Sequence, residues 1–213
     1  MAGCCDPRGC DRLFGARFAK RMATRYRKRG LDKTAQTIVE MVAQGGVQGA
    51  TVLEVGGGVG EIQLELLRRG AASATNLELS PGYEPEAAAL IEDAGLGGRV
   101  HRRLIDIATD PAAVEPADIV VLHRVVCCYP DVAKLLGAAA DHARSQLVFS
   151  HPPRNAVSRA VVGTQNLLFR AVGREFRTFA HSPDAMLAVL AEHGLQLSAA
   201  HRGRMWQVAA VSR

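Results

Sequence analysis

The sequence lacks the features that mark secreted and membrane-spanning chains. No apolar run approaches the roughly 20 residues that cross a bilayer. Residues 1–30 are polar and rich in arginine and do not contain the apolar core of a signal peptide. These absences predict a cytoplasmic protein without a membrane span. The length of 213 residues is sufficient to bury a substantial core.

Cysteine is scarce, and its pattern argues against the usual structural roles. The five cysteines form two distant clusters, Cys4, Cys5 and Cys10 in one and Cys127 and Cys128 in the other. An odd count without a signal peptide argues against a disulfide scaffold, and adjacent cysteines match no standard zinc spacing. We therefore predict free thiols and no metal site. A metal or redox site shared by the cysteines is the alternative.

Aromatic residues are also few, and the charge is unevenly distributed. Three Tyr and one Trp leave little surface for stacking on nucleic-acid bases. The net charge is +5, but residues 1–30 sum to +7 and the remainder to −2. The basic segment is either a solvated helix face or a contact for an acidic partner. We predict the former, and RNA binding through residues 8–29 is the alternative.

Helix and strand patterns alternate along most of the chain. Apolar residues every four positions predict helices over 11–29 and 32–44. The strands expected after them are 50–55, 73–80, 100–107, 117–126, 145–152, 195–203 and 205–213, and the further helices are 60–70, 82–96, 131–143 and 182–194. This alternation predicts an α/β protein with a seven-stranded, mostly parallel sheet and helices on both faces. Only "RGR" separates the last two strands, which should therefore form an antiparallel hairpin.

One segment interrupts the alternation. Residues 154–180 contain a helix of about 16 residues followed by "FRTFA". An insertion after the carboxyl end of a strand lies at the edge where such sheets bind ligands, so we predict a substrate lid. We expect residues 1–48 to form an N-terminal helical cap and residues 49–213 the main domain. The helix of this segment has apolar residues along one side. The alternative interpretation is that this side packs on the sheet.

The glycines of "TVLEVGGGVG", residues 51–60, predict a nucleotide site. No Lys follows Gly60, so a triphosphate-binding loop is excluded, and the spacing Gly56-x-Gly58-x-Gly60 differs from the dinucleotide pattern. Glu54 stands two residues before the first glycine, where its negative charge repels phosphate and attracts a cation. The expected ligand therefore carries positive charge and little phosphate.

These residues resemble the first motif, [DE]-x-G-x-G-x-G, of the class I S-adenosylmethionine-dependent methyltransferases. Glu54, Gly56, Gly58 and Gly60 match every specified position, and the resemblance extends over about residues 50–213 apart from the insertion. It implies a Rossmann-like fold and S-adenosylmethionine as the cofactor. Within the family the chain looks most like the small-molecule enzymes, which implies a small, hydrophobic or aromatic methyl acceptor. The alternatives are an RNA methyltransferase and a non-catalytic cofactor-binding module.

The resemblance also implies roles for individual residues. Glu78, with Leu79 beside it, stands where the family binds the ribose hydroxyls, and Asp106 and Ile107 stand where it holds the adenine. His123 falls near the methionine part of the cofactor, and Arg25 on the N-terminal helix is placed to pair with the methionine carboxylate.

Methyl transfer from a sulfonium requires chiefly that the acceptor be held in line with the carbon–sulfur bond in a dry site, although some acceptors also need a base. The candidate catalytic residues are His151, His123 and Tyr129. The "NPPY" type of signature for nucleobase amino groups is absent from the fourth strand, which makes a nucleic-acid acceptor unlikely on sequence grounds. The sequence leaves the acceptor and the oligomeric state open.

Overall fold

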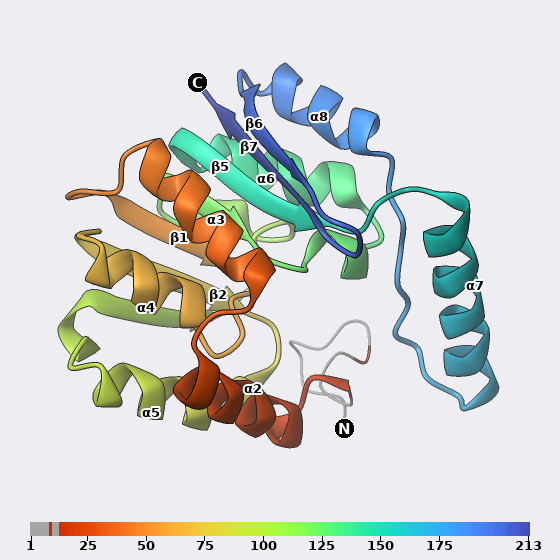
Figure 1. The fold of residues 1–213 in the computed structure, drawn as a ribbon, viewed down its shortest axis with the longest axis horizontal. Helices are drawn as coiled ribbons and strands as arrows, with labels where there is room; N and C mark the ends of the chain where they lie inside the picture. The colour runs from red at the N-terminus through yellow and green to blue at the C-terminus, as the bar shows by residue number, and fades with distance from the viewer. Residues whose placement is uncertain (1–8, 10–12) are drawn as a thin grey trace.

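The computed structural model describes Gly9 and residues 13–213, which form one seven-stranded sheet flanked by helices (Figure 1). The strand order is β3-β2-β1-β4-β5-β7-β6. The strands are β1 (Thr51–Val55), β2 (Ser73–Glu78), β3 (Val100–Leu104), β4 (Ala117–Leu122), β5 (Ala143–His151), β6 (Gln196–Arg202) and β7 (Gln207–Ser212). The predictions for Cys4, Cys5 and Cys10 lie outside the described residues.

The sheet is parallel from β3 to β5, and β7 is antiparallel to both of its neighbours. The central strand β4 reads "ADIVVL", and its last four residues are fully buried. Such a continuous apolar run is typical of a parallel strand that is covered on both faces. The predicted fold class, including the closing hairpin, is confirmed.

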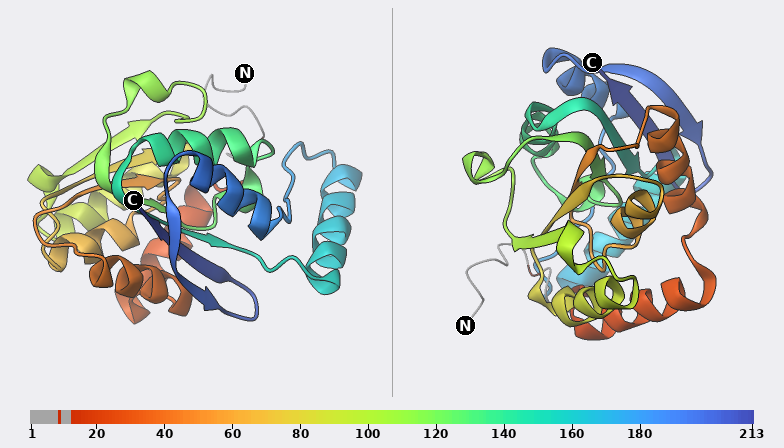
Figure 2. Two further views of the ribbon diagram at one scale, coloured as in Figure 1. Left: turned by 90° about the horizontal axis from the view of Figure 1, so that it is seen from above. Right: turned by 90° about the vertical axis from the view of Figure 1, so that its left-hand side faces the viewer.

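Two sets of helices cover the two faces of the sheet (Figure 2). One set shares a core with Ile119 and Val148, and the other shares a core with Val120 and Phe149. The first set is α2 (Ala16–Arg29), α3 (Lys33–Gln44), α4 (Glu61–Arg68) and α5 (Glu84–Asp93); the second is α6 (Val132–Asp141) and α8 (Pro183–Glu192). Since α2 and α3 share this core with the sheet, they are integrated into the fold. A cap that ends at residue 48 stays a prediction.

Several element ends differ from the sequence-based expectation. Helix α2 begins at Ala16, because the chain bends at Phe14 and Gly15 and interrupts the helix expected over 11–29. Strand β3 ends at Leu104, because Asp106 accepts a hydrogen bond from the Ala108 N–H and turns the chain there. The expected extension of this strand to residue 107 is therefore wrong. Within the described part of the chain, none of the helices is long and apolar enough to span a membrane.

The inserted helix α7 (Ala156–Ala171) has the predicted length of 16 residues and stands apart from the sheet (Figures 1 and 2). None of its residues is buried, and Val157, Val161 and Leu168 are more than half exposed. Packing of its apolar side on the sheet, the alternative interpretation, is therefore wrong. Phe176 anchors the segment after α7, since its buried ring contacts Phe14 in an edge-to-face arrangement with centroids 5.3 Å apart.

Candidate functional site

A cavity of about 200 Å³ lies where β1, β2 and β4 end, and we call it the first cavity. Carboxyl ends of parallel strands are the usual ligand edge of such sheets. Its wall consists of Phe14, Phe18, Met22, Glu54, Gly56, Gly57, Gly58, Val59, Glu61, Ile62, Glu78, Leu79, Ser80, Tyr83, His123, Arg124, Val125, Cys128 and Tyr129. Helix α2 therefore contributes two apolar side chains one turn apart, Phe18 and Met22, and the strand ends contribute polar groups.

The glycine loop forms the part of the wall between β1 and α4. Gly56, Gly58 and Gly60 all have positive φ, at 64°, 56° and 83°, a region that costs other residues free energy. A Cβ at Gly56 would lie 2.6 Å from a Val125 methyl group. The predicted glycines are thus required both by the backbone turn and by close packing, which bring the chain near to any ligand in the cavity.

Glu78 is held at the end of β2 by three backbone N–H groups. Gly58 donates to Oε2 at 2.9 Å, and Leu79 and Ser80 donate to Oε1 at 2.7 and 3.1 Å. A carboxylate has about four lone-pair sites, so three are occupied and Oε2 can accept one further hydrogen bond. This fixed, buried carboxylate lines the first cavity and is suited to bind a hydroxyl group of a ligand.

Glu54 and Glu61 add two further buried carboxyl groups to the same wall. Burial, together with the negative charge of Glu61, raises the pKa of Glu54 to about 8. Burial likewise raises the pKa of Glu61. The Asn76 side-chain N–H lies 3.4 Å from Glu54 Oε2. A cation in the cavity would favour the charged form of both groups, so the first cavity is suited to a positively charged ligand.

The structure brings most of the predicted cofactor residues together. Glu54, Glu78, Leu79 and His123 line the first cavity, as do Gly56 and Gly58, while Gly60 caps α4 behind it. Together they form a concave, acidic and partly apolar wall with a tight glycine turn. These residues fit a nucleoside that carries a cationic group.

Asp106, Ile107 and Arg25 lie behind this wall. Asp106 accepts a hydrogen bond from the Tyr129 hydroxyl, and Tyr129 itself lines the cavity. Ile107 is only 1% exposed and packs in the core beside Leu77. Direct contact of Asp106 and Ile107 with a ligand stays a prediction, because Tyr129 stands between Asp106 and the cavity.

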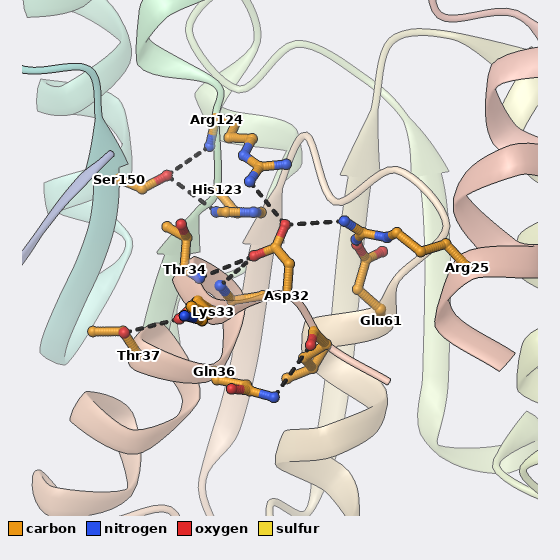
Figure 3. A network of polar contacts seen from close by, with 12 residues as sticks. Arg25, Asp32, Lys33, Thr34, Gln36, Thr37, Glu61, His123, Arg124 and Ser150 are labelled. Carbon is orange, nitrogen blue, oxygen red and sulfur yellow. Dashed lines mark hydrogen bonds and ion pairs between the residues drawn. The ribbon is translucent and has the colours of Figure 1, made fainter. Parts of the chain in front are cut away.

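Arg25 belongs to a charged network that joins α2, α3 and β4 (Figure 3). Its guanidinium donates to Asp32 Oδ2 at 3.1 Å and lies 3.6 Å from Glu61. Arg124 binds the same Asp32 oxygen at 2.8 Å. Burial would raise the pKa of Asp32, but the hydrogen bond from the Ala35 N–H and the charge of Arg124 lower it to about 2. Asp32 is therefore ionised and holds two arginines.

His123 follows β4, and the Ser150 hydroxyl fixes its ring at 3.0 Å from Nδ1 (Figure 3). Burial and the positive charge of Arg124 lower the pKa of His123 to about 3. The ring is therefore neutral near pH 7 and a weak base. The Ser150 Oγ also accepts the Arg124 backbone N–H at 2.9 Å.

The other predicted catalytic histidine is elsewhere. His151 is buried at the end of β5, its Nδ1 lies 3.0 Å from the Pro152 carbonyl oxygen, and burial lowers its pKa. It is not among the residues that line the first cavity. Of the three candidate catalytic residues, the structure thus brings His123 and Tyr129 to the cavity.

Sequence reasoning missed Asp32, Glu61 and Ser150. Asp32 has the sequence position of a helix N-cap and does cap α3 by accepting from the Thr34 and Ala35 N–H groups. Glu61 directly follows the glycine motif. Its burial, which distinguishes it from an ordinary helix-start glutamate, is visible only in the structure. A sequence signal was present for both residues, because each stands at the start of a helix whose first turn faces the ligand-binding edge of the sheet.

The remaining sequence predictions concern cysteines and nucleic acid. Cys127 and Cys128 are free thiols with sulfur atoms 3.5 Å apart. In the residues that the structure describes, no group of three His, Cys, Asp or Glu is placed to hold a metal ion. Arg17 and Arg21 are exposed on α2, whereas Arg25 is paired with Asp32. These positions do not test RNA binding by α2, which stays an alternative.

Comparison with known proteins gives the following matches. Residues 53–146 match a family model described as a methyltransferase domain. Magnesium protoporphyrin IX methyltransferase from Synechocystis PCC 6803, solved with bound SAH, is 21% identical with a TM-score of 0.69, and the match covers 85% of this chain and 82% of that one. No curated protein sequence gives a significant match.

Two longer solved structures are also similar. An O-methyltransferase family protein from Burkholderia thailandensis is 20% identical with a TM-score of 0.70, covering 92% of this chain and 58% of that one. An O-methyltransferase family 2 protein from Planctomyces limnophilus DSM 3776, in complex with apigenin, is 18% identical with a TM-score of 0.61, covering 86% and 62%. The chain spans less than two-thirds of these two proteins, and identities at this level show the shared fold.

Proposed function

We propose that the chain is a class I S-adenosylmethionine-dependent methyltransferase that methylates a small, hydrophobic or aromatic molecule. The match of residues 53–146 to a methyltransferase-domain family model and the shared fold with a methyltransferase solved with bound SAH support this proposal. The observation that carries the proposal is the first cavity, in which the glycine turn, Glu54 and Glu78 form one buried acidic wall. S-adenosylmethionine supplies an activated methyl group on a sulfonium sulfur, which an acceptor nucleophile takes in line.

The residues divide the work of holding this cofactor. Glu78, fixed by three backbone N–H groups, accepts a hydrogen bond from the ribose hydroxyls at Oε2. Glu54 and Glu61 balance the cationic groups, and Asp106, acting through Tyr129, closes the adenine end. Leu79 and Phe14, together with the α2 side chains Phe18 and Met22, exclude water from the cavity.

The acceptor then meets the methyl group at the His123 and Tyr129 side of the cavity. A neutral His123 with a pKa of about 3 orients the acceptor and is too weak a base to remove its proton at neutral pH. Positioning therefore supplies most of the rate enhancement. The segment 154–180 is proposed as the lid over this side, since α7 presents an unpacked apolar face. The apigenin complex of a structural neighbour supports a flat aromatic acceptor.

Calorimetric titration of the full chain with S-adenosylhomocysteine tests the proposal. We expect binding with one site per chain, and much weaker binding of NAD⁺ and ATP, because their phosphates would face Glu54 and Glu61. Absence of S-adenosylhomocysteine binding, or equal binding of NAD⁺, contradicts the proposed function. Transfer of a labelled methyl group from S-adenosylmethionine to a panel of aromatic molecules then identifies the acceptor.

A further inference from the structure

A second cavity, of about 430 Å³, adjoins the first at Arg124, whose side chain lines both. Its wall comes from the first turns of α3 and from the turn between β6 and β7. The lining residues are Asp32, Lys33, Thr34, Thr37, Arg124, His201, Gly203, Arg204, Met205 and Trp206. No sequence motif marks this cavity. None of the residues proposed to bind the cofactor lines it.

The charge of the second cavity is opposite to that of the first. Lys33, Arg124 and Arg204 line it against a single carboxylate, Asp32. That carboxylate is already occupied by Arg25 and Arg124 and has its pKa lowered to about 2. An anionic group entering the second cavity therefore meets uncompensated positive charge from Lys33 and Arg204.

Arg124 is held in a costly conformation at the boundary of the two cavities. Its φ is 59°, the only positive value among the described residues other than glycine. The Ser150 hydroxyl accepts its backbone N–H, and Asp32 holds its guanidinium (Figure 3). Its Nε is buried without a hydrogen-bond partner. Strained backbone of this kind persists where surrounding contacts enforce it and is concentrated at functional sites.

Trp206 provides a flat surface beside this charge. The Arg124 guanidinium carbon lies 5.1 Å from the centre of the Trp206 ring, within the range of a cation–π contact. Met205 next to it is 78% exposed. The cavity thus combines an aromatic and apolar surface with a cluster of cations, which is suited to a flat molecule that carries an anionic group.

We propose that the second cavity binds the methyl acceptor through a carboxylate or similar anionic group, with Lys33, Arg124 and Arg204 as its partners and Trp206 against its flat body. This inference rests on the proposed function, since it assigns the acceptor class for the same enzyme. The opposite charges of the two cavities would hold the cationic donor in the first and draw the anionic group of the acceptor into the second, so that the rest of the acceptor can reach the methyl group past Arg124.

The single tryptophan of the chain makes the test direct, because Trp206 is the only source of tryptophan fluorescence. The full chain, saturated with S-adenosylhomocysteine, is titrated with 2-naphthoate and with its neutral isostere 2-naphthamide. We expect 2-naphthoate to change the Trp206 emission and to bind about tenfold more tightly than the amide, since one hydrogen bond to a charged group contributes roughly 1.5–3 kcal/mol.

Charge-removing variants locate the effect. Lys33→Gln and Arg204→Gln should each weaken 2-naphthoate binding several-fold and leave 2-naphthamide binding and S-adenosylhomocysteine affinity unchanged. Arg202→Gln is the matched control, because it removes an exposed cation of the same hairpin that does not line the cavity. It should change none of these affinities.

The outcomes separate this inference from the proposed function. Equal binding of the acid and the amide, or an Arg202→Gln effect as large as that of Arg204→Gln, overturns the anionic acceptor class even if S-adenosylhomocysteine binds normally. Failure of S-adenosylhomocysteine to bind overturns the proposed function, whatever the naphthoate result.

Discussion

The two cavities on either side of Arg124 differ in charge, in origin and in how readily a sequence reveals them. The first has three buried carboxyl groups, Glu54, Glu61 and Glu78, beneath the apolar side chains of α2. The second is lined by three cations, Lys33, Arg124 and Arg204, and by a single carboxylate, Asp32. One sheet edge thus has two cavities of opposite charge side by side.

The cavities also differ in what the fold must do to build them. The wall of the first comes largely from the ends of β1, β2 and β4, where register positions the side chains. That of the second needs the α3 N-terminus and the β6–β7 turn to meet, although they lie far apart in sequence. Substitutions and changes of pH at each cavity test this contrast, and the Glu78 carboxylate is expected to matter most.

Loss of the Glu78 carboxylate should damage the first cavity most. Glu78→Ala removes the acceptor of three backbone N–H groups and of the proposed ribose contacts. We expect S-adenosylhomocysteine affinity in calorimetry to fall roughly 100-fold, from the loss of hydrogen bonds worth about 1.5–3 kcal/mol each. Glu92→Ala, at an exposed position of α5, is the control. An unchanged affinity for the Glu78 variant would remove the ribose assignment.

The raised pKa of Glu54 predicts a pH dependence that only the first cavity should show. A cation binds best to the ionised carboxylate, so S-adenosylhomocysteine affinity should rise by up to about tenfold per pH unit between pH 6 and 8. Titration at several pH values checks this. Glu54→Gln should flatten the dependence, whereas 2-naphthoate binding in the second cavity should not strengthen over this range. A Glu54→Gln profile identical to that of the native chain contradicts the assignment.

The same shift has a consequence for the ligand-free protein. The folded-state pKa of Glu54 is raised above its ordinary value of 4.5 to about 8, so the native state holds the proton more tightly than the unfolded chain. The Glu54 contribution to stability is fully present below the unfolded pKa and is lost as pH rises towards 8. Saturating S-adenosylhomocysteine should reduce this loss, which urea unfolding at pH 5 and pH 8 would measure.

Two variants of Arg124 separate the contribution of its guanidinium to binding from the free-energy cost of its positive φ. Arg124→Gly and Arg124→Ala both remove the guanidinium and should weaken 2-naphthoate binding about equally. Only glycine adopts a φ of 59° freely, so the glycine variant should be more stable than the alanine variant by about 1 kcal/mol in urea unfolding. Equal stabilities would show that the backbone relaxes when the side chain is lost.

The smallest effect is expected on α7, which lines neither cavity. Leu168→Gln alters a side chain that is 61% exposed and should change stability by less than about 0.5 kcal/mol. The affinity for S-adenosylhomocysteine should change less than about twofold, within the same limit for surface substitutions. The affinity for 2-naphthoate should fall by more than this limit, because the segment 154–180 is proposed as the lid over the acceptor. An unchanged affinity for 2-naphthoate would contradict the lid.

The sequence predicts the fold and the first cavity well because their determinants are local. The strand–helix alternation gives the sheet, and Glu54, Gly56, Gly58 and Glu78 belong to short motifs at strand ends. Their structural role follows from the strand register, since β1 and β2 pair in parallel and end together.

The rest depends on contacts between distant segments. Asp32 and Arg124 are 92 residues apart in sequence, and nothing about either residue type predicts that they form an ion pair. The withdrawal of Ile107 into the core and the exposure of α7 are likewise set by packing, which residue spacing does not specify. The second cavity therefore emerges only when the tertiary structure brings together a helix end and a hairpin.

Asp32 links the two cavities thermodynamically. One of its oxygens accepts hydrogen bonds from both Arg25, beside Glu61 at the first cavity, and Arg124, at the boundary with the second. An anion that draws Arg124 towards itself leaves more of the Asp32 charge to Arg25, and a cation near Glu61 acts in the reverse direction. For the two proposed ligands, the shared carboxylate would therefore couple the binding equilibria, and linkage requires that each ligand change the affinity of the other by the same factor.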